Sequence, residues 1–416
     1  MESLKELFRI GNGPSSSHTM GPKKIVEEFL KRYNDSDYIE VTLYGSLALT
    51  GKGHLTDKVI DDVLADIKHK IEFDIKKKVK HPNTMIVKGY RGKKVIHQMK
   101  AYSVGGGAIE IDGEKAIVKK DVYKLSKFED IKAYCKEKNM RLYEYVDECE
   151  PEIEEYLKEV LSVMEDAIKR GLSQEGVLPG KLQVKRKAKK IYENNPENPL
   201  EKYYKDALAF AFAVSEENAS GGKIVTAPTC GACGVLPSVI EVLKRTSKYS
   251  EKQILNALKT AGLIGNLLKT NASISGAVAG CQAEVGSACS MGAALVAEIN
   301  GKDYDTIAHA AEIAMEHHLG LTCDPVMGYV QIPCVSRNGV AAGRAFTSYS
   351  LACYLEGVQS SISFDEICEI MLKTGMDLSS KYRETSSGGL AKLKKNIVKR
   401  LNAIDIENNI EQNEEE

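Results

Sequence analysis

The hydrophobic pattern of the chain changes at about residue 150, and this change constrains the fold more than any other feature. Before it, segments 38–49 and 93–104 show the alternation of β-branched and aromatic residues that is typical of strands, whereas residues 21–33 have the period of a helix. Beyond residue 200, nearly every periodic segment is helical. The sequence therefore predicts the α+β fold class, with an N-terminal α+β domain followed by a mostly all-α domain.

The junction between these two regions contains a helical pattern followed by a linker. Apolar residues at helical spacing from Ile153 to Ile168 predict a helix that ends near Gly171, and a stretch with Gly, Pro and a basic run follows it. The predicted domains are an α+β domain at 1–150, a helix and linker at 151–200, an all-α catalytic domain at 201–403, and an acidic tail at 404–416. We expect the tail to be frayed.

Composition excludes several classes of partner. Lys plus Arg (57) almost balances Asp plus Glu (58), so no global field draws the chain to nucleic acid or to a membrane surface. The start MESLKELFRI lacks the basic residues and apolar core of a signal peptide, and apolar runs are interrupted well before about 18 residues. We therefore expect a cytoplasmic protein with no nucleic-acid and no membrane partner.

Ten cysteines in such a chain do not form a disulfide framework, because the cytosol keeps thiols reduced. Cys281, Cys323 and Cys334 each stand in a short segment with Gly or Pro between helical patterns, where thiols can converge. Three thiolates around a four-iron cluster leave one iron open to act as a Lewis acid. The spacing alone is equally compatible with ordinary buried cysteines.

A second cysteine pattern is the pair Cys230 and Cys233 in TAPTCGACGV. Three readings stay open for it: a redox pair, part of a zinc site, or two small residues in a tight loop. One CxxC without a second pair favours the tight loop.

The most distinctive string of the first region is GNGPSSSHTMGP. Its residues Ser15, Ser16, Ser17 and His18 precede the helical pattern that starts at residue 21. Hydroxyls and backbone N–H groups at a helix start form an anion site that suits a carboxylate. The alternative is an elaborate helix cap, for which one serine is enough.

Two polar turns follow in the same region. His54 stands beside Lys52 and Thr56, and a loop histidine titrates near neutral pH, as a general base requires. A lone histidine is nevertheless more often a hydrogen-bonded turn residue. Asn83 lies in a second polar turn, HPNTM, ahead of apolar residues.

Together, these strings resemble the bacterial iron–sulfur-dependent L-serine dehydratases in their single-chain form, and the resemblance covers most of the chain. In the first region it is carried by GPSSSHTMGP, YGSLALTGKGHLTD, HPNTM and YSVGGG. In the second it is carried by EGVLPG, VTAPTCGACGVLP, NASISGAVAGCQAEVGSACSM, EHHLGLTCDPVMGYVQIPC and KYRETSSGGLA.

The resemblance implies L-serine as substrate, pyruvate and ammonia as products, a [4Fe-4S] cluster as cofactor and a homodimer as assembly. It implies that Cys281, Cys323 and Cys334 hold the cluster. It further implies a wall of the active site from the first domain, with His54 as the most plausible general base and with Ser15, Ser16, Ser17, His18, Thr56 and Asn83. Our mechanistic hypothesis adds Lys52 or Arg383 as a partner of the substrate carboxylate.

One departure from the family concerns the fourth cluster position. Some single-chain members end in a cysteine that can occupy it in the resting enzyme, whereas this chain ends in EQNEEE, so we expect another ligand, such as water, and no autoinhibition by the tail. We also expect no appended regulatory domain after about residue 400.

Three rival functions stay open at this point. The same scaffold could act on L-threonine, whose extra methyl a pocket accepts at a cost of about 1–3 kcal/mol. A pyridoxal-phosphate enzyme performs the same overall reaction, although no string marks a cofactor lysine. A non-catalytic serine sensor would leave the three loop cysteines unexplained.

Overall fold

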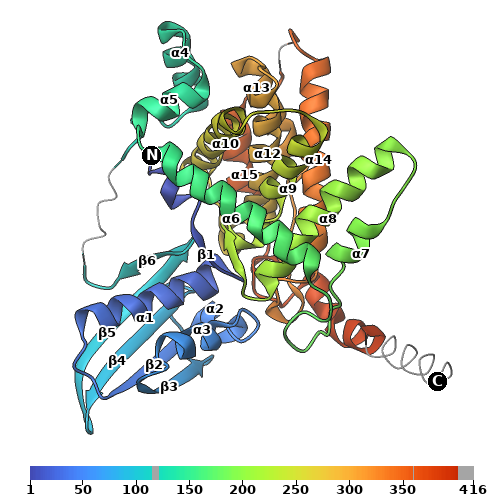
Figure 1. The fold of residues 1–416 in the computed structure, drawn as a ribbon. Helices are drawn as coiled ribbons and strands as arrows, with labels where there is room; N and C mark the ends of the chain where they lie inside the picture. The colour runs from blue at the N-terminus through green and yellow to red at the C-terminus, as the bar shows by residue number, and fades with distance from the viewer. Residues whose placement is uncertain (115–120, 359, 402–416) are drawn as a thin grey trace, which may run out of the picture.

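The computed structural model describes residues 1–114, 121–358 and 360–401, and the predicted acidic tail lies outside them. Figure 1 shows a small sheet-containing part beside a larger body of helices, as the α+β class predicts. Two of the described core clusters correspond to these parts, one under the sheet and one among the helices.

The small part is a five-stranded sheet in the order β3-β2-β4-β5-β6, in which β2 and β3 are parallel and the other neighbours are antiparallel. Its strands are β2 (Tyr38–Tyr44), β3 (Lys68–Asp74), β4 (Thr84–Arg91), β5 (Lys94–Gly105) and β6 (Ala108–Ile111). Helices α1 (Gly21–Arg32), α2 (Gly45–Thr50) and α3 (Thr56–Val63) accompany them. Ile25 and Phe29 of α1 share a fully buried core with Val41 and Val87 of the sheet.

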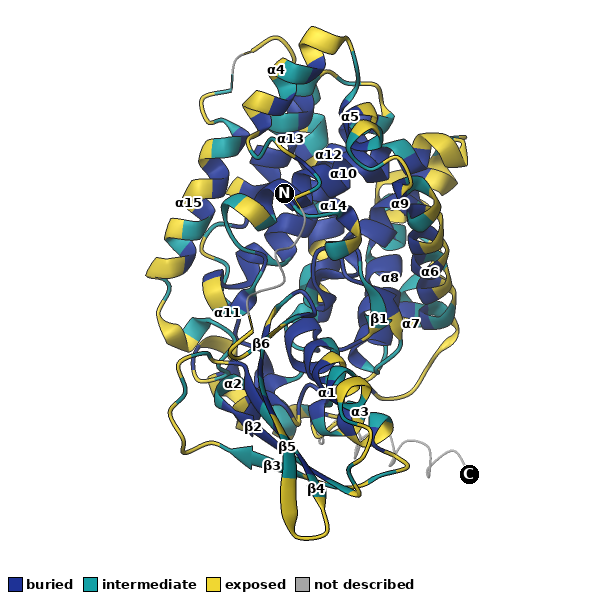
Figure 2. Ribbon diagram, turned by 90° about the vertical axis from the view of Figure 1, so that its left-hand side faces the viewer, coloured by how far each residue is buried: buried dark blue, intermediate teal, exposed yellow. Residues whose placement is uncertain are grey.

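The large part is built around α12 (Val285–Ile299), whose most extensive contacts are with three other helices. Its first 14 residues are buried, and Figure 2 shows this helix in the dark blue centre of the molecule. Small residues allow the close packing: a Cβ built on Gly292 would lie 3.1 Å from Ala345 Cβ. Its neighbours are α10 (Glu251–Asn271), α13 (Tyr304–Glu316) and α14 (Cys334–Tyr354).

The remaining helices surround this centre. Six of them are α6 (Ile153–Ser173), α7 (Ala188–Glu193), α8 (Pro199–Ala219), α9 (Val235–Thr246), α11 (Gly276–Ala279) and α15 (Phe364–Asp377). The predicted helix from Ile153 is confirmed and ends two residues after Gly171. The predicted helix at 21–33 and the predicted strand at 93–104 are confirmed as α1 and β5.

The predicted strand at 38–49 is right only as far as Tyr44. Gly45 has a φ of +55°, which a residue with a side chain adopts at a cost, and helix α2 begins there. Space is also limited, since a Cβ on Gly45 would lie 2.4 Å from the Pro82 carbonyl oxygen. This turn directs the following segment toward the polar loop instead of continuing the sheet.

Two early segments pack with the helices. Leu4 and Phe8 are fully buried, and both side chains lie within 3 Å of where a Cβ on Gly262 of α10 would stand. Strand β1 (Ile10–Asn12) pairs with β7 (Lys223–Val225), which makes the helical part mostly rather than wholly α. Helices α4 (Phe128–Lys138) and α5 (Leu142–Cys149) contribute to the helical core as well. We therefore propose that the α+β domain covers roughly residues 13–112. The boundary at residue 150 stays a prediction.

No helix among the described residues is long and apolar enough to span a membrane.

Candidate active site

The polar loop predicted from SSSHT is buried between the two parts of the molecule. Ser15 caps a one-turn helix (Ser16–Met20) that leads into α1, and its Oγ accepts from the N–H of His18 at 3.1 Å. Thr19 Oγ1 donates to the carbonyl oxygen of His54 at 2.7 Å. Ser16 and Ser17 are both less than a tenth exposed. The hydroxyls of Ser15, Ser17 and Thr19 all bond to protein atoms, and the anion site stays a prediction.

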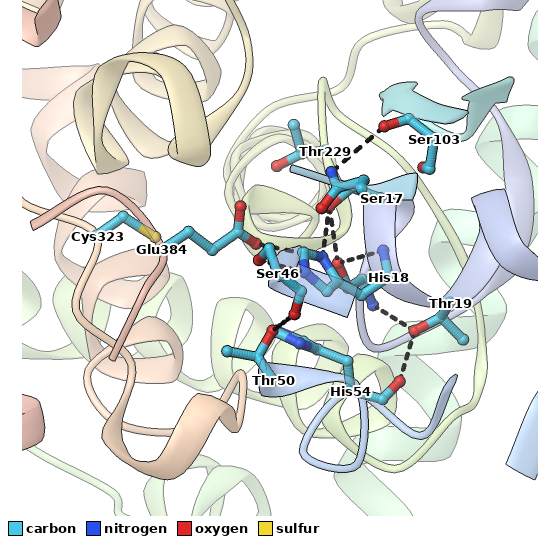
Figure 3. Close-up of polar contacts among 12 residues, drawn as sticks. Ser17, His18, Thr19, Ser46, Thr50, His54, Ser103, Thr229, Cys323 and Glu384 are labelled. Atoms are coloured by element: carbon cyan, nitrogen blue, oxygen red, sulfur yellow. Dashed lines mark hydrogen bonds and ion pairs between the residues drawn. The ribbon is translucent and has the colours of Figure 1, made fainter. Parts of the chain in front are cut away.

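His18 is held in one orientation by hydroxyls on both sides of its ring. Nδ1 lies 2.8 Å from Ser17 Oγ, and Nε2 lies 2.9 Å from Ser46 Oγ of α2 (Figure 3). Burial, followed by the charge of His54, lowers the pKa of His18 well below its ordinary value. His18 is therefore neutral at physiological pH, with neither ring nitrogen left over for a further partner.

His54 stands against His18, with ring centroids 4.5 Å apart, and only 1% of its surface is exposed. Burial lowers the pKa of His54 to about 4. By distance and angle neither Nδ1 nor Nε2 makes a hydrogen bond with a described residue, although a contact with the Thr50 backbone partly opposes the effect of burial on the pKa. Buried polar atoms are nearly always paired, so two unpaired ring nitrogens indicate a place where a ligand or water binds.

Thr56 and Asn83 complete this wall. Thr56 Oγ1 donates to the carbonyl oxygen of His18 at 2.5 Å, which fixes the loop against α3. Asn83 Nδ2 donates to the carbonyl oxygen of Ser103 at 3.3 Å, while Asn83 Oδ1 and Ser103 Oγ are buried without a partner. The sequence predictions Ser15, Ser16, Ser17, His18, His54, Thr56 and Asn83 thus lie in one region.

Lys52 and Arg383 are placed differently. Lys52 is exposed, and its ammonium lies 5.4 Å from the ring centroid of Phe73 on β3. Arg383 Nη1 donates to the carbonyl oxygen of Val278 at 3.3 Å, and its buried Nε has no partner. The structure provides no contact between either cation and the histidines, so their role in holding a carboxylate stays a prediction.

The three cysteines come from three elements of the helical part. Cys281 opens a 3-10 turn (Cys281–Ala283) just before α12, Cys323 lies in the loop after α13, and Cys334 is the first residue of α14. The loop location expected for all three is right for Cys323, whereas Cys334 belongs to a helix. A helix N-terminus favours a negative charge, so Cys334 is well placed to bind as a thiolate.

These thiols are near enough to influence one another. Burial raises the pKa of the Cys334 thiol above its ordinary value, and the charge of Cys281 raises it further. The charge of Arg337 opposes this rise, whereas those of Glu284 and Glu384 add to it. Burial raises the pKa of Cys281 to about 11, against the opposing effect of a hydrogen bond and the charge from Arg337. Burial raises the pKa of Cys323 too. Protonated thiols at neutral pH become ligands only when a bound cation stabilises their anions.

The donor set fits an iron–sulfur cluster better than a single ion. Within residues 1–114, 121–358 and 360–401, no group of three or more His, Cys, Asp or Glu side chains is arranged to hold one metal ion. Three thiols that influence one another electrostatically, two of them buried and that of Cys334 half-buried, are nevertheless the ligand chemistry of iron–sulfur clusters, which are bulkier than an ion. The adjacent Arg337 offsets part of their negative charge.

Sequence reasoning missed four side chains of this region. Ser46, Glu284 and Glu384 lie inside strings that carried the family resemblance, so their membership was the available signal. Glu284 is half-buried, accepts from Thr229 Oγ1 at 2.8 Å and lies 3.9 Å from Cys323 Sγ. Arg337 interacts with Asp324 at 3.5 Å, and no pattern in the sequence indicated this pair.

Glu384 links the two halves of the site. Its backbone N–H donates to the carbonyl oxygen of Cys323 at 2.8 Å, and its Oε1 lies 3.8 Å from His18 Nδ1. Figure 3 shows Glu384 between Cys323 and the group around His18 and Ser46. Burial, followed by the charge of Glu284, raises the pKa of Glu384 to about 8. Glu384 therefore connects the segment that carries Cys323 to His18.

Cys230 and Cys233 lie beside this region without joining it. Both are about 1% exposed, and Cys230 Sγ stands 3.9 Å from Met20 Sδ. Burial raises the pKa of both thiols, which opposes the thiolate that redox chemistry needs. These surroundings agree with the interpretation of Cys230 and Cys233 as two small residues in a tight loop.

Comparison with known proteins shows which family the chain is similar to. A family model described as the serine dehydratase alpha chain matches residues 56–391, and one described as the serine dehydratase beta chain matches residues 3–61. The chain belongs to the serine dehydratase family. It is 39% identical to L-serine dehydratase 2 of Escherichia coli over 94% of this chain and 98% of the relative.

Two further relatives agree over similar lengths. The L-serine dehydratase of Haemophilus influenzae is 37% identical, covering 94% of this chain and 99% of its own. The L-serine dehydratase of Streptomyces coelicolor is 38% identical, covering 94% and 98%. The matched span includes both the histidine wall and the three cysteines, so membership of the family does not depend on one part of the molecule.

Proposed function

We propose that this chain is an L-serine ammonia-lyase that converts L-serine to pyruvate and ammonia with a [4Fe-4S] cluster held by Cys281, Cys323 and Cys334. The observation that carries the proposal is the position of Glu384, which joins the cysteine loop to His18. The names of the full-length relatives supply the substrate. The cytoplasmic location and the homodimer stay predictions.

The β-hydroxyl of serine is a poor leaving group. A cluster held by Cys281, Cys323 and Cys334 would supply a Lewis acid for its departure. The protein's own task is to place the substrate so that its hydroxyl faces the cysteines and its Cα–H bond faces His54. The hydroxyls of the polar loop and Asn83 would orient the carboxylate.

His54 is the candidate general base. Its pKa of about 4 leaves the ring neutral at pH 7, and both ring nitrogens are without a protein partner. One of them accepts the α-proton while the electrons of the Cα–H bond form the Cα=Cβ bond and hydroxide leaves. The resulting aminoacrylate tautomerises to an imine, which water hydrolyses to pyruvate and ammonia. Stacking on His18 keeps the ring in position.

Three variants test the proposal after anaerobic purification. Cys323→Ala should lose iron and pyruvate formation together, because a bound thiolate is removed. His54→Ala should keep its iron and lose turnover. Cys353→Ala, a half-buried thiol of α14 outside the site, is the matched control and should keep both. An iron-free protein that is fully active would refute the proposal. Assays on L-threonine measure the preference between the two β-hydroxy amino acids.

A further inference from the structure

The string KYRETSSGGLA holds a carboxylate that the chemistry above does not use. Glu384 has a φ of +56°, a left-handed conformation that costs a residue with a side chain about 1 kcal/mol or more. Its N–H bond to Cys323 and the backbone bridge between Cys323 and Arg383 hold it in this conformation. Such strain persists where the surroundings fix a side chain in one direction, and this one is directed into the site (Figure 3).

The carboxyl group of Glu384 has no cationic partner among the described Lys and Arg residues. Its side chain is 12% exposed, and its nearest basic atom is His18 Nδ1 at 3.8 Å. That nitrogen is already bonded to Ser17 Oγ, and the ring of His18 is neutral. The one further partner is the backbone N–H of Ala277. The Glu384 side chain therefore reaches the site without a cationic partner from the protein, and a cationic ligand would supply one.

The neighbouring carboxylate is less suited to that role. Glu284 Oε1 accepts from Thr229, and its Oε2 is directed at Cys323 Sγ, so both oxygens are engaged with protein atoms. The Glu384 carboxylate, in contrast, faces the histidine wall (Figure 3). Of the two, Glu384 is the carboxylate that a substrate beside His54 would meet.

We propose that the Glu384 carboxylate binds the α-ammonium group of the amino-acid substrate and so selects α-amino acids over α-hydroxy acids. This inference rests on the proposed function. It gives each polar group of serine its own partner: hydroxyls and an amide for the carboxylate, the cysteine side for the β-hydroxyl, and Glu384 for the ammonium. Charge-assisted hydrogen bonds of this kind are about twice as strong as neutral ones.

The test compares ligands that differ in one group. L-alanine and L-lactate are nearly isosteric, and only the first carries an ammonium. Their dissociation constants are measured by calorimetry on the cluster-loaded wild type and on E384Q, and their inhibition constants and the KM for L-serine are measured alongside. We expect E384Q to weaken L-alanine by roughly 10- to 100-fold and to change L-lactate less than about threefold. The KM for L-serine should rise by a factor similar to that for L-alanine.

Two controls separate positioning from binding. Glu384→Asp keeps the charge and should retain part of the preference for L-alanine. E369Q, an exposed carboxylate of α15, should behave as the wild type. Equal weakening of both ligands, an unchanged L-serine KM, or loss of iron from E384Q would each overturn the inference. A wild type that binds L-alanine over L-lactate through Glu384 but forms no pyruvate would refute the proposed function instead.

Discussion

The buried, unpaired His54 should make the protein sensitive to mild acid. Its pKa is about 4 in the folded chain against an ordinary value of 6.5 in the unfolded chain. Between these values the unfolded state binds the proton and the folded state does not, so the free energy of unfolding falls as the pH falls. The full difference corresponds to about 3 kcal/mol, and about 2 kcal/mol of it is lost between pH 7 and pH 5.

The assay is urea unfolding at pH 7 and pH 5, followed by circular dichroism because the chain contains no Trp. His54→Gln cannot bind this proton, so its free energy of unfolding should fall by about 2 kcal/mol less than that of the wild type over this interval. His317→Gln, which replaces an exposed histidine, is the control and should follow the wild type. Equal pH dependence in wild type and His54→Gln would refute the reasoning, because it would mean that His54 already has a partner or solvent around it.

Three further predictions test other parts of the structure. Ser46→Ala removes the hydroxyl at His18 Nε2 and should lower kcat/KM for L-serine by about fivefold, measured as pyruvate formation. Gly375→Ala would place a Cβ 2.3 Å from Ala279 Cβ, next to the turn that carries Cys281, so the iron content of the purified variant should fall. Phe8→Ala should lower the free energy of unfolding by about 3–5 kcal/mol, because this fully buried ring joins the N-terminal segment to α10, whereas Leu49→Ala at an exposed position should change little.

The elements that the sequence predicted well are those whose periodicity matches their burial. Helix α6 shows its apolar stripe from Ile153 onward because one face packs on the core, and β5 alternates for the same reason. Segment 38–49 misled the prediction because the residues after Tyr44 are as apolar as a strand. The turn at Gly45 depends on the close approach of the Pro82 carbonyl, which belongs to a distant segment.

The candidate site was predictable where it depends on local strings and not where it depends on long-range contacts. SSSHT and the turn of His54 are compact, so their residues could be named from the sequence. Glu384 and Glu284 are separated by 100 positions and become neighbours only through packing, as the effect of Glu284 on the pKa of Glu384 shows. Lys52 looked suitable because it is close to His54 in the sequence, yet its side chain lies over Phe73.

The central claim is that one chain combines an iron–sulfur cluster with deamination of L-serine. It is tested most directly by iron and sulfide analysis of the anaerobically purified protein together with a pyruvate assay on L-serine, before and after iron is removed by a chelator. The account predicts about four irons and four sulfides per chain, and loss of pyruvate formation in proportion to the iron removed. Full activity in the iron-free chain would contradict it.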